Sequence, residues 1–362
     1  MTDRLATLMH GEMETLDVPG VPTPEILAAG HRLRRRRTWT RVTAASGVIV
    51  VALATVAAVT LGDHSSTTPG PASTAKDTPT LAYGIDDTVY VGDDATPVHL
   101  PEVAQTLYYT SAGILVRTNK DGSSDGGAPF HFELIGVDGK ATKLGVTLGE
   151  VVPSTDATQP YLAWATMSDG KIQVVVHDVS TDQDVARVDV PGSFTWGGWD
   201  APPVSLSGDL VYVGTDDHAE VVDWRTGQAH ASDVVPGSTF ATIVDGRYLD
   251  LRDGGVDVMD AESGKVLMHA SGAVNDAELS PDGRFAVVSQ GGQDKLYDLD
   301  TGATSHISLS SYGWAYDGDS VYGVSGSTLT SCSTITGACH ETHVPPVGRN
   351  AMVRYAGQAF ES

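Results

Sequence analysis

The feature that most constrains this chain is a short turn sequence that returns at regular intervals. Its pattern is an apolar residue, aspartate, two variable residues, threonine or serine, and glycine, and the four best copies end 35 to 38 residues apart. They end at Gly227, Gly264, Gly302 and Gly337, with Ser333 replacing the aspartate in the last copy. An aspartate side chain can cap such a turn, and glycine supplies the positive φ that closes a hairpin. A turn at this period predicts an array of similar structural units.

Three further copies lie upstream, near Thr96, Gly139 and Asp182, which makes seven units. Apolar and polar residues alternate before the turns, as in 171–176 and 255–259, and this alternation predicts β-strands. Further short apolar runs precede these strands in each unit, so we expect four antiparallel strands per unit.

Two stretches carry a resemblance to known families. LSPDGRFAVVS followed by LYDLDTG resembles the WD-repeat and related envelope propellers, and GVDVMDAESGKVLMH is similar to the repeat of quinoprotein-like propellers. The resemblance implies an all-β fold, a seven-bladed β-propeller over residues 81–362. These motifs mark hairpin geometry and recur in propellers of unrelated function, so they predict architecture and not activity.

The count of strands predicts how the ring closes. The first unit has only three strands, whereas the segment 349–360 is left over after the last unit and contains a strand-like run at 350–355. We predict that this run is the innermost strand of the first blade. An open ring would expose two unpaired sheet edges, so joining the two ends removes both.

Residues 42–61 form an uncharged apolar run, long enough as a helix of about 30 Å to cross a bilayer. Six arginines between residues 32 and 41 precede it, which predicts a cytoplasmic N-terminus and a single-pass cell-membrane protein. We therefore expect a short helical cytosolic segment at 1–41, a transmembrane helix at 42–61, a Ser/Thr/Pro linker at 62–80 and an extracytoplasmic propeller at 81–362.

Charge is divided unevenly along the chain. The whole chain has a net charge of −24, while the first 41 residues carry seven arginines and five acidic residues. A strongly acidic exported domain repels nucleic acid, so we expect no DNA or RNA partner. The acidity favours solubility in an exposed location, with binding of a cation or a basic partner as the alternative.

Cys332 and Cys339 are the only cysteines, and they flank the last turn. If Ser333 opposes Ala338 in that hairpin, the two cysteines oppose each other within reach of a disulfide. An exported domain is a place where such a bond persists. A free thiol pair or a metal site with neighbouring histidines is the alternative.

Oxygen-bearing side chains at Asp121, Ser123 and Asp125 resemble the beginning of a calcium loop. The residue twelve positions from its start is Phe132, where a calcium loop needs a glutamate. A solvated loop between strands is the simpler interpretation, and we expect no cofactor, with calcium as the alternative.

Aromatic side chains fall in or beside the predicted inner strands. The candidates for ligand binding are Trp196, Trp199, Tyr312, Trp314, Tyr108 and Tyr109. Inner-strand ends line the mouth of a propeller's channel, where these rings could stack on a sugar or a peptide. Packing between neighbouring blades is the alternative.

The sequence contains none of the linear motifs of serine hydrolases, zinc proteases, nucleotide-binding loops or dinucleotide-binding folds. The main hypothesis is therefore a binding, scaffold or sensor module for an envelope protein or glycan. The layout and the stretch TPEILAAGHRLRRRR are similar to actinobacterial membrane proteins encoded beside extracytoplasmic-function sigma factors. That resemblance implies an alternative, an anti-sigma-like regulator with a cytosolic partner for residues 1–41. A propeller-type hydrolase or lactonase is the third hypothesis.

Overall fold

The computed structural model describes residues 80–358, apart from 124–126, 196–197, 238–241 and 349–350. The chain divides into two compact units, and the first, Met1–Thr67, lies outside the described residues. The predicted cytosolic segment and the predicted span at 42–61 therefore lie outside them as well. Within the described part of the chain, no helix is long and apolar enough to cross a membrane.

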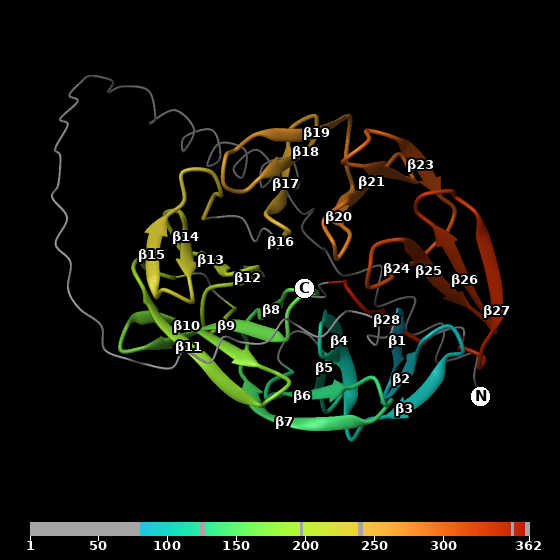
Figure 1. The fold of residues 1–362 in the computed structure, drawn as a ribbon, viewed down its shortest axis with the longest axis horizontal. Coiled ribbons are helices and arrows are strands. Elements are labelled where there is room, and N and C mark those ends of the chain that lie inside the picture. Colours follow the sequence, from blue (N-terminus) through green and yellow to red (C-terminus); the bar gives the residue numbers. More distant parts are fainter. Residues whose placement is uncertain (1–79, 124–126, 196–197, 238–241, 349–350, 359–362) are drawn as a thin grey trace, which may run out of the picture. The chain divides into compact units, whose positions relative to one another are not determined.

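The described residues form seven four-stranded antiparallel sheets that follow one another around a ring (Figure 1). This confirms the prediction of an all-β, seven-bladed propeller. Within each blade the strands run in order from the centre of the ring to its outer edge.

Blade 1 contains β28 (Val353–Tyr355), β1 (Ala82–Ile85), β2 (Thr88–Val91) and β3 (Thr96–His99). Blade 2 contains β4 (Val103–Thr110), β5 (Gly113–Asn119), β6 (Phe130–Ile135) and β7 (Ala141–Leu148). Blade 3 contains β8 (Ser154–Thr155), β9 (Tyr161–Ser168), β10 (Lys171–Asp178) and β11 (Gln183–Val190). Blade 4 contains β12 (Val204–Ser207), β13 (Leu210–Gly214), β14 (Ala219–Asp223) and β15 (Gln228–Ala231).

Blade 5 contains β16 (Ile243–Val244), β17 (Arg247–Arg252), β18 (Gly255–Asp260) and β19 (Val266–Ser271). Blade 6 contains β20 (Asp276–Leu279), β21 (Phe285–Gln290), β22 (Gln293–Asp298) and β23 (Thr304–Ile307). Blade 7 contains β24 (Gly313–Trp314), β25 (Ser320–Ser325), β26 (Thr328–Ser333) and β27 (Cys339–His343).

The ring closes as the strand count predicts. Strand β28 pairs with β1 in antiparallel register, with Tyr355 opposite Tyr83. A parallel bridge between Ala356 and Leu107 continues from β28 to the inner strand of blade 2. On the other side, the Tyr322 hydroxyl of blade 7 donates a hydrogen bond to the carbonyl of Ala82. Blade 1 is thus joined to both neighbours by residues close to the two ends of the propeller.

The repeated turns are built as the sequence predicts. In the turn at Asp223, the carboxylate accepts the N–H of Thr226, and in the turn at Ser333 the hydroxyl oxygen accepts the N–H of Thr336. Glycine closes the four best copies with φ between 68° and 74°. In blade 3 this position is held by Asp182, whose φ of 54° lies in the left-handed region that aspartate tolerates better than most residues.

The hydrophobic core lies between neighbouring blades, because the face of each sheet packs against the sheet of the next blade. The largest buried cluster joins blades 2, 3 and 4 and includes Phe132, Trp164 and Val211. Burial of apolar side chains at this scale is the main stabilising contribution of such a fold.

The predicted disulfide is present. Cys332 and Cys339 are bonded across the outer hairpin of blade 7, and their Cα atoms are 4.0 Å apart. The backbone N–H of Ser333 donates to the carbonyl of Ala338, which is the register that the prediction assumed. The described part of the chain holds no free cysteine.

Candidate functional site

A cavity of about 660 Å³ lies among the inner strands at the centre of the ring, and we call it the central cavity. The walls come from β4, β8, β12 and β16 and from the turns that follow the inner strands of blades 3 to 6. We call the side of the propeller that carries these turns the mouth face. Successive strands are antiparallel, so the turns between second and third strands lie on the opposite face.

Carboxylates dominate the charge of the central cavity. Its described lining contains six of them and no lysine, arginine or histidine; they are Asp156, Asp209, Asp245, Asp260, Glu262 and Asp282. Four of the six occupy the turn after an inner strand, in blades 3, 4, 5 and 6. Asp317 holds the same position in blade 7. An aspartate in this turn in five consecutive blades is a signal that sequence reasoning missed, because the pattern of the outer turns is the stronger one.

Some of these carboxylates hold the turns together. Asp156 accepts the N–H of Thr158 at 2.8 Å and, from the next blade, the N–H of Gly208 at 2.7 Å. Asp260 accepts the N–H of Ser263 at 2.7 Å. Hydrogen bonds of this kind stabilise the ionised form and fix the turn geometry.

Three of the other four carboxylates form the exposed rim of the cavity. Asp245 and Glu262 both belong to blade 5 and are exposed, and Asp209 is exposed but has Arg225 2.5 Å away. Burial, together with the charges of Glu262 and Asp260, raises the pKa of the Tyr212 hydroxyl in the cavity wall. The central cavity therefore has a negative potential on the blade 5 side.

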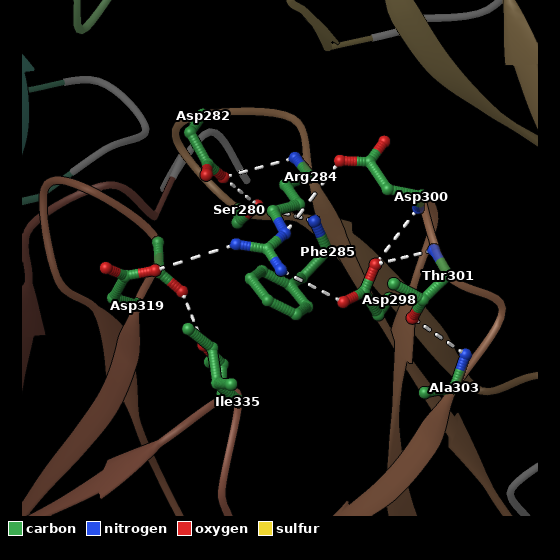
Figure 2. A network of polar contacts seen from close by, with 12 residues as sticks. Ser280, Asp282, Arg284, Phe285, Asp298, Asp300, Thr301, Ala303, Asp319 and Ile335 are labelled. Atoms are coloured by element: carbon green, nitrogen blue, oxygen red, sulfur yellow. Dashed lines mark hydrogen bonds and ion pairs between the residues drawn. The ribbon is translucent and has the colours of Figure 1, made fainter.

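A polar network on the mouth face fixes the wall formed by blade 6, as Figure 2 shows. Asp282 accepts the backbone N–H of Arg284 at 3.1 Å. The guanidinium of Arg284 lies 3.2 Å from Asp298 in its own blade and 3.9 Å from Asp319 in blade 7. One arginine thus joins turns of two blades, and it neutralises carboxylates outside the cavity, not those on its rim.

Two of the predicted aromatic residues, Tyr108 and Tyr109, line the central cavity. The Tyr109 hydroxyl donates a hydrogen bond of 2.7 Å to the carbonyl of Trp314 in blade 7, and its ring meets Tyr316 edge to face. Both tyrosines are almost fully buried, at 8% and 2% exposure, so they offer a ligand little ring surface.

Tyr312 and Trp314 lie at the junction of blades 6 and 7. Trp314 is completely buried, and its indole N–H donates to Glu278 at 2.8 Å. Burial raises the pKa of Glu278 to about 7, against the opposing hydrogen bonds from Tyr312 and Trp314. The structure thus places Trp314 where packing between blades, the alternative interpretation, accounts for it.

The other predicted residues lie elsewhere. Trp199 is half-buried in the connection between β11 and β12 and does not line the central cavity, while Trp196 lies outside the described residues. The Asp121 carboxylate accepts the N–H of Ser123 at 3.0 Å, and Asp125 lies outside the described residues. The described residues contain no cluster of three or more potential metal ligands. Ligand binding by the predicted aromatics and calcium binding stay predictions.

A second cavity, of about 670 Å³, lies between blades 2 and 3, and we call it the side groove. His177 lies in it with its two ring nitrogens 2.9 Å from Asp184 and 3.1 Å from Asp182. Both nitrogens can donate at once only when the ring is protonated. Asp182 also accepts the N–H of Gly145 on β7, so this chain of contacts ties the outer edge of blade 2 to blade 3.

The other carboxylates of the side groove are also paired. Arg187 lies 2.6 Å from Asp184, and Asp200 accepts the N–H of Glu150 at 2.9 Å. Burial raises the pKa of Asp184, but hydrogen bonds from His177 and Arg187 outweigh burial, so its pKa lies below the ordinary value.

Comparisons with known proteins assign the chain to no family. No family description and no curated protein matches the chain. Among solved structures it is similar to apo AztD from Citrobacter koseri, at 11% identity over 76% of this chain and 98% of that one, with a TM-score of 0.47. It is also similar to TolB from Acinetobacter baumannii, at 19% identity over 63% and 62% of the two chains, with a TM-score of 0.39. A protein of unknown function from Desulfotomaculum acetoxidans matches at 10% identity over 76% and 99%, with a TM-score of 0.45.

At these identities the likeness concerns the fold alone. The chain is a seven-bladed β-propeller whose central cavity is rimmed by carboxylates.

Proposed function

We propose that this protein is a membrane-anchored, extracytoplasmic binding module that holds a basic segment of an envelope protein in its central cavity. One observation carries the proposal: the described lining of this cavity has six carboxylates and no cationic side chain. A cavity of about 660 Å³ is in the size range of ligand sites in proteins. The exposed position of Asp245 and Glu262 makes their charge accessible to a partner.

The charge pattern favours a basic polypeptide over a neutral glycan. Stacking of a sugar would use exposed aromatic faces, whereas Tyr108 and Tyr109 are almost fully buried. Lysine and arginine side chains gain from a carboxylate-lined site, and a domain of one charge sign also accelerates the approach of an oppositely charged partner.

The proposed location rests on separate observations. The apolar run at 42–61 behind an arginine cluster supports a single-pass anchor with the propeller outside the cytoplasm. The Cys332–Cys339 disulfide supports an oxidising compartment for blade 7. The anti-sigma-like hypothesis concerns residues 1–41, which lie outside the described residues, and it stays a prediction.

The test is binding of a fluorescently labelled lysine-rich peptide to the full chain in detergent micelles. Neutralising the rim in the double variant Asp245→Asn/Glu262→Gln should weaken the affinity about tenfold, since two exposed ion pairs are each worth up to about 1 kcal/mol. The matched control is Asp217→Asn/Asp253→Asn, which removes the same charge from exposed turns on the opposite face of blades 4 and 5. It should change the affinity less than twofold.

Equal weakening in both double variants would show that the peptide senses only net charge, and the proposed site would be wrong. Binding of an uncharged oligosaccharide such as chitotetraose, with no binding of the lysine-rich peptide, would favour the glycan hypothesis instead.

A further inference from the structure

The chain does not stop where the ring is closed. After β28, the N–H of Ala356 donates to the carbonyl of Ala82 at 2.9 Å, and the N–H of Gly357 donates to the carbonyl of Leu107 at 3.1 Å. The side-chain amide of Gln358 then donates to the carbonyl of Tyr312 at 2.6 Å. Three successive residues therefore bond to blades 1, 2 and 7.

This segment passes between opposite walls of the ring. A Cβ atom on Gly357 would lie 3.1 Å from the ring of Tyr109 in blade 2 and 3.2 Å from Pro281 in blade 6. Its φ of 81° is one that other residues rarely adopt. Gly357 and Gln358 both line the central cavity. Glycine is favoured here, because the positive φ would strain any other residue and a Cβ atom would make tight contacts with both rings.

Ring closure accounts for only part of this segment. The closing ladder consists of Val353–Tyr355 paired with β1, and the N–H of Gly357 completes the parallel bridge between Ala356 and Leu107 of blade 2. Gly357 and Gln358 belong to no strand, and they form part of the wall of the cavity that we propose as the binding site. Their described side chains carry no charge, so they add nothing to the attraction of a basic partner.

We propose that Gly357 and Gln358 form an autoinhibitory plug, which covers part of the central cavity and must be displaced before the partner segment binds fully. The proposal rests on the proposed function of the same cavity. A plug that is seated most of the time lowers the apparent affinity by the fraction of molecules in which it is displaced.

Two truncations of the full chain separate the plug from the residues after it. Deleting residues 357–362 removes the plug and keeps β28, whereas deleting residues 359–362 keeps the plug and removes the same acidic residue, Glu361. Affinity for the lysine-rich peptide should rise about five- to tenfold in the first truncation. It should stay within twofold of the full chain in the second.

A labelling experiment tests the plug without any partner. Thr155 on β8 lines the cavity, and the two native cysteines are bonded to each other, so Thr155→Cys provides a single reactive thiol. Its rate of reaction with a maleimide should rise several-fold when residues 357–362 are deleted. Gln358→Ala, which removes only the bond to Tyr312, should give a smaller rise in the labelling rate. This variant replaces the truncation in the experiment if the truncated protein melts at a lower temperature.

The outcomes separate the two proposals. Unchanged labelling in both variants would overturn the plug, whatever the peptide does. Faster labelling without any peptide binding would support the plug and overturn the proposed function. Faster labelling with unchanged peptide affinity would show that the segment covers the cavity without competing, and autoinhibition would be wrong.

Discussion

The side groove and the central cavity have nearly the same volume, about 670 and 660 Å³, and both are lined by several carboxylates. In the side groove, Asp182 and Asp184 share a histidine, and Arg187 balances the second of them. In the central cavity, Asp245 and Glu262 face solvent in a described lining without cations. Charges that satisfy each other stabilise blade 3 and, through the contact of Asp182 with the Gly145 N–H, its attachment to blade 2, whereas charges left exposed are available to a partner. Nearly equal volume and the presence of carboxylates in both cavities therefore do not imply equal function.

The largest effect is expected from His177→Leu, which removes the centre of the side groove. His177 is only 4% exposed and has a carboxylate at each ring nitrogen. Losing the hydrogen bonding between this buried ring and the two carboxylates should lower the free energy of unfolding by about 2 to 3 kcal/mol, measured by chemical denaturation.

The matched control is His230→Leu on the outer strand of blade 4, where the histidine is exposed. It should change stability by less than about 0.5 kcal/mol. Peptide binding at the central cavity should persist in both variants. A His177→Leu protein as stable as the control would show that the paired charges of the side groove do not hold blades 2 and 3 together.

Glu278 is a third kind of acidic residue in this protein. Its carboxyl group is kept neutral by a bound proton and is not paired with a cation. Burial raises its pKa to about 7 in the folded protein, from an ordinary value of 4.5. A raised pKa of an acid means that the neutral form is preferred in the folded state, so stability should fall as the pH rises from 4.5 to 7. Relative to wild type, Glu278→Gln should gain about 2 to 3 kcal/mol of stability over this interval.

Chemical denaturation at about pH 5 and at about pH 8, which together cover most of this interval, measures the difference in stability between wild type and Glu278→Gln. Parallel stability curves for wild type and Glu278→Gln would contradict the inferred burial of this carboxyl group.

Asp184 in the side groove should behave in the opposite sense. Burial alone would raise its pKa, but hydrogen bonds from His177 and Arg187 lower it below the ordinary value, so the ionised form is preferred in the folded state. The stabilisation is present at neutral pH and is lost as the pH falls through the lowered pKa. Asp184→Asn should therefore be less stable than wild type at neutral pH, with the difference shrinking in acid. Chemical denaturation across this pH range is the measurement, and a difference that grows on acidification would rule out this assignment.

The features that depend on local spacing could be predicted from the sequence. Turn capping at Asp223, the Cys332–Cys339 pairing and the closing strand β28 all follow from residue order and a strand count. The rim of the central cavity could not be predicted from the sequence, because its carboxylates come from turns of different blades and only the closed ring brings them together. The choice between ligand binding and packing for Trp314 could not be made from the sequence, since the face that an inner strand turns toward its neighbour depends on how the blades stack.

The smallest effect on stability is expected at the site proposed for function. Asp245 has a φ of 48°, a conformation that asparagine tolerates as well as aspartate, and Glu262 is exposed. Asp245→Asn/Glu262→Gln should therefore change the free energy of unfolding by less than about 0.5 kcal/mol, or stabilise slightly by relieving repulsion between like charges. Chemical denaturation of this double variant beside His177→Leu measures the contrast directly. A loss of stability comparable to that of His177→Leu would mean that the rim carboxylates hold the blades together too, and the distinction between the two cavities would fail.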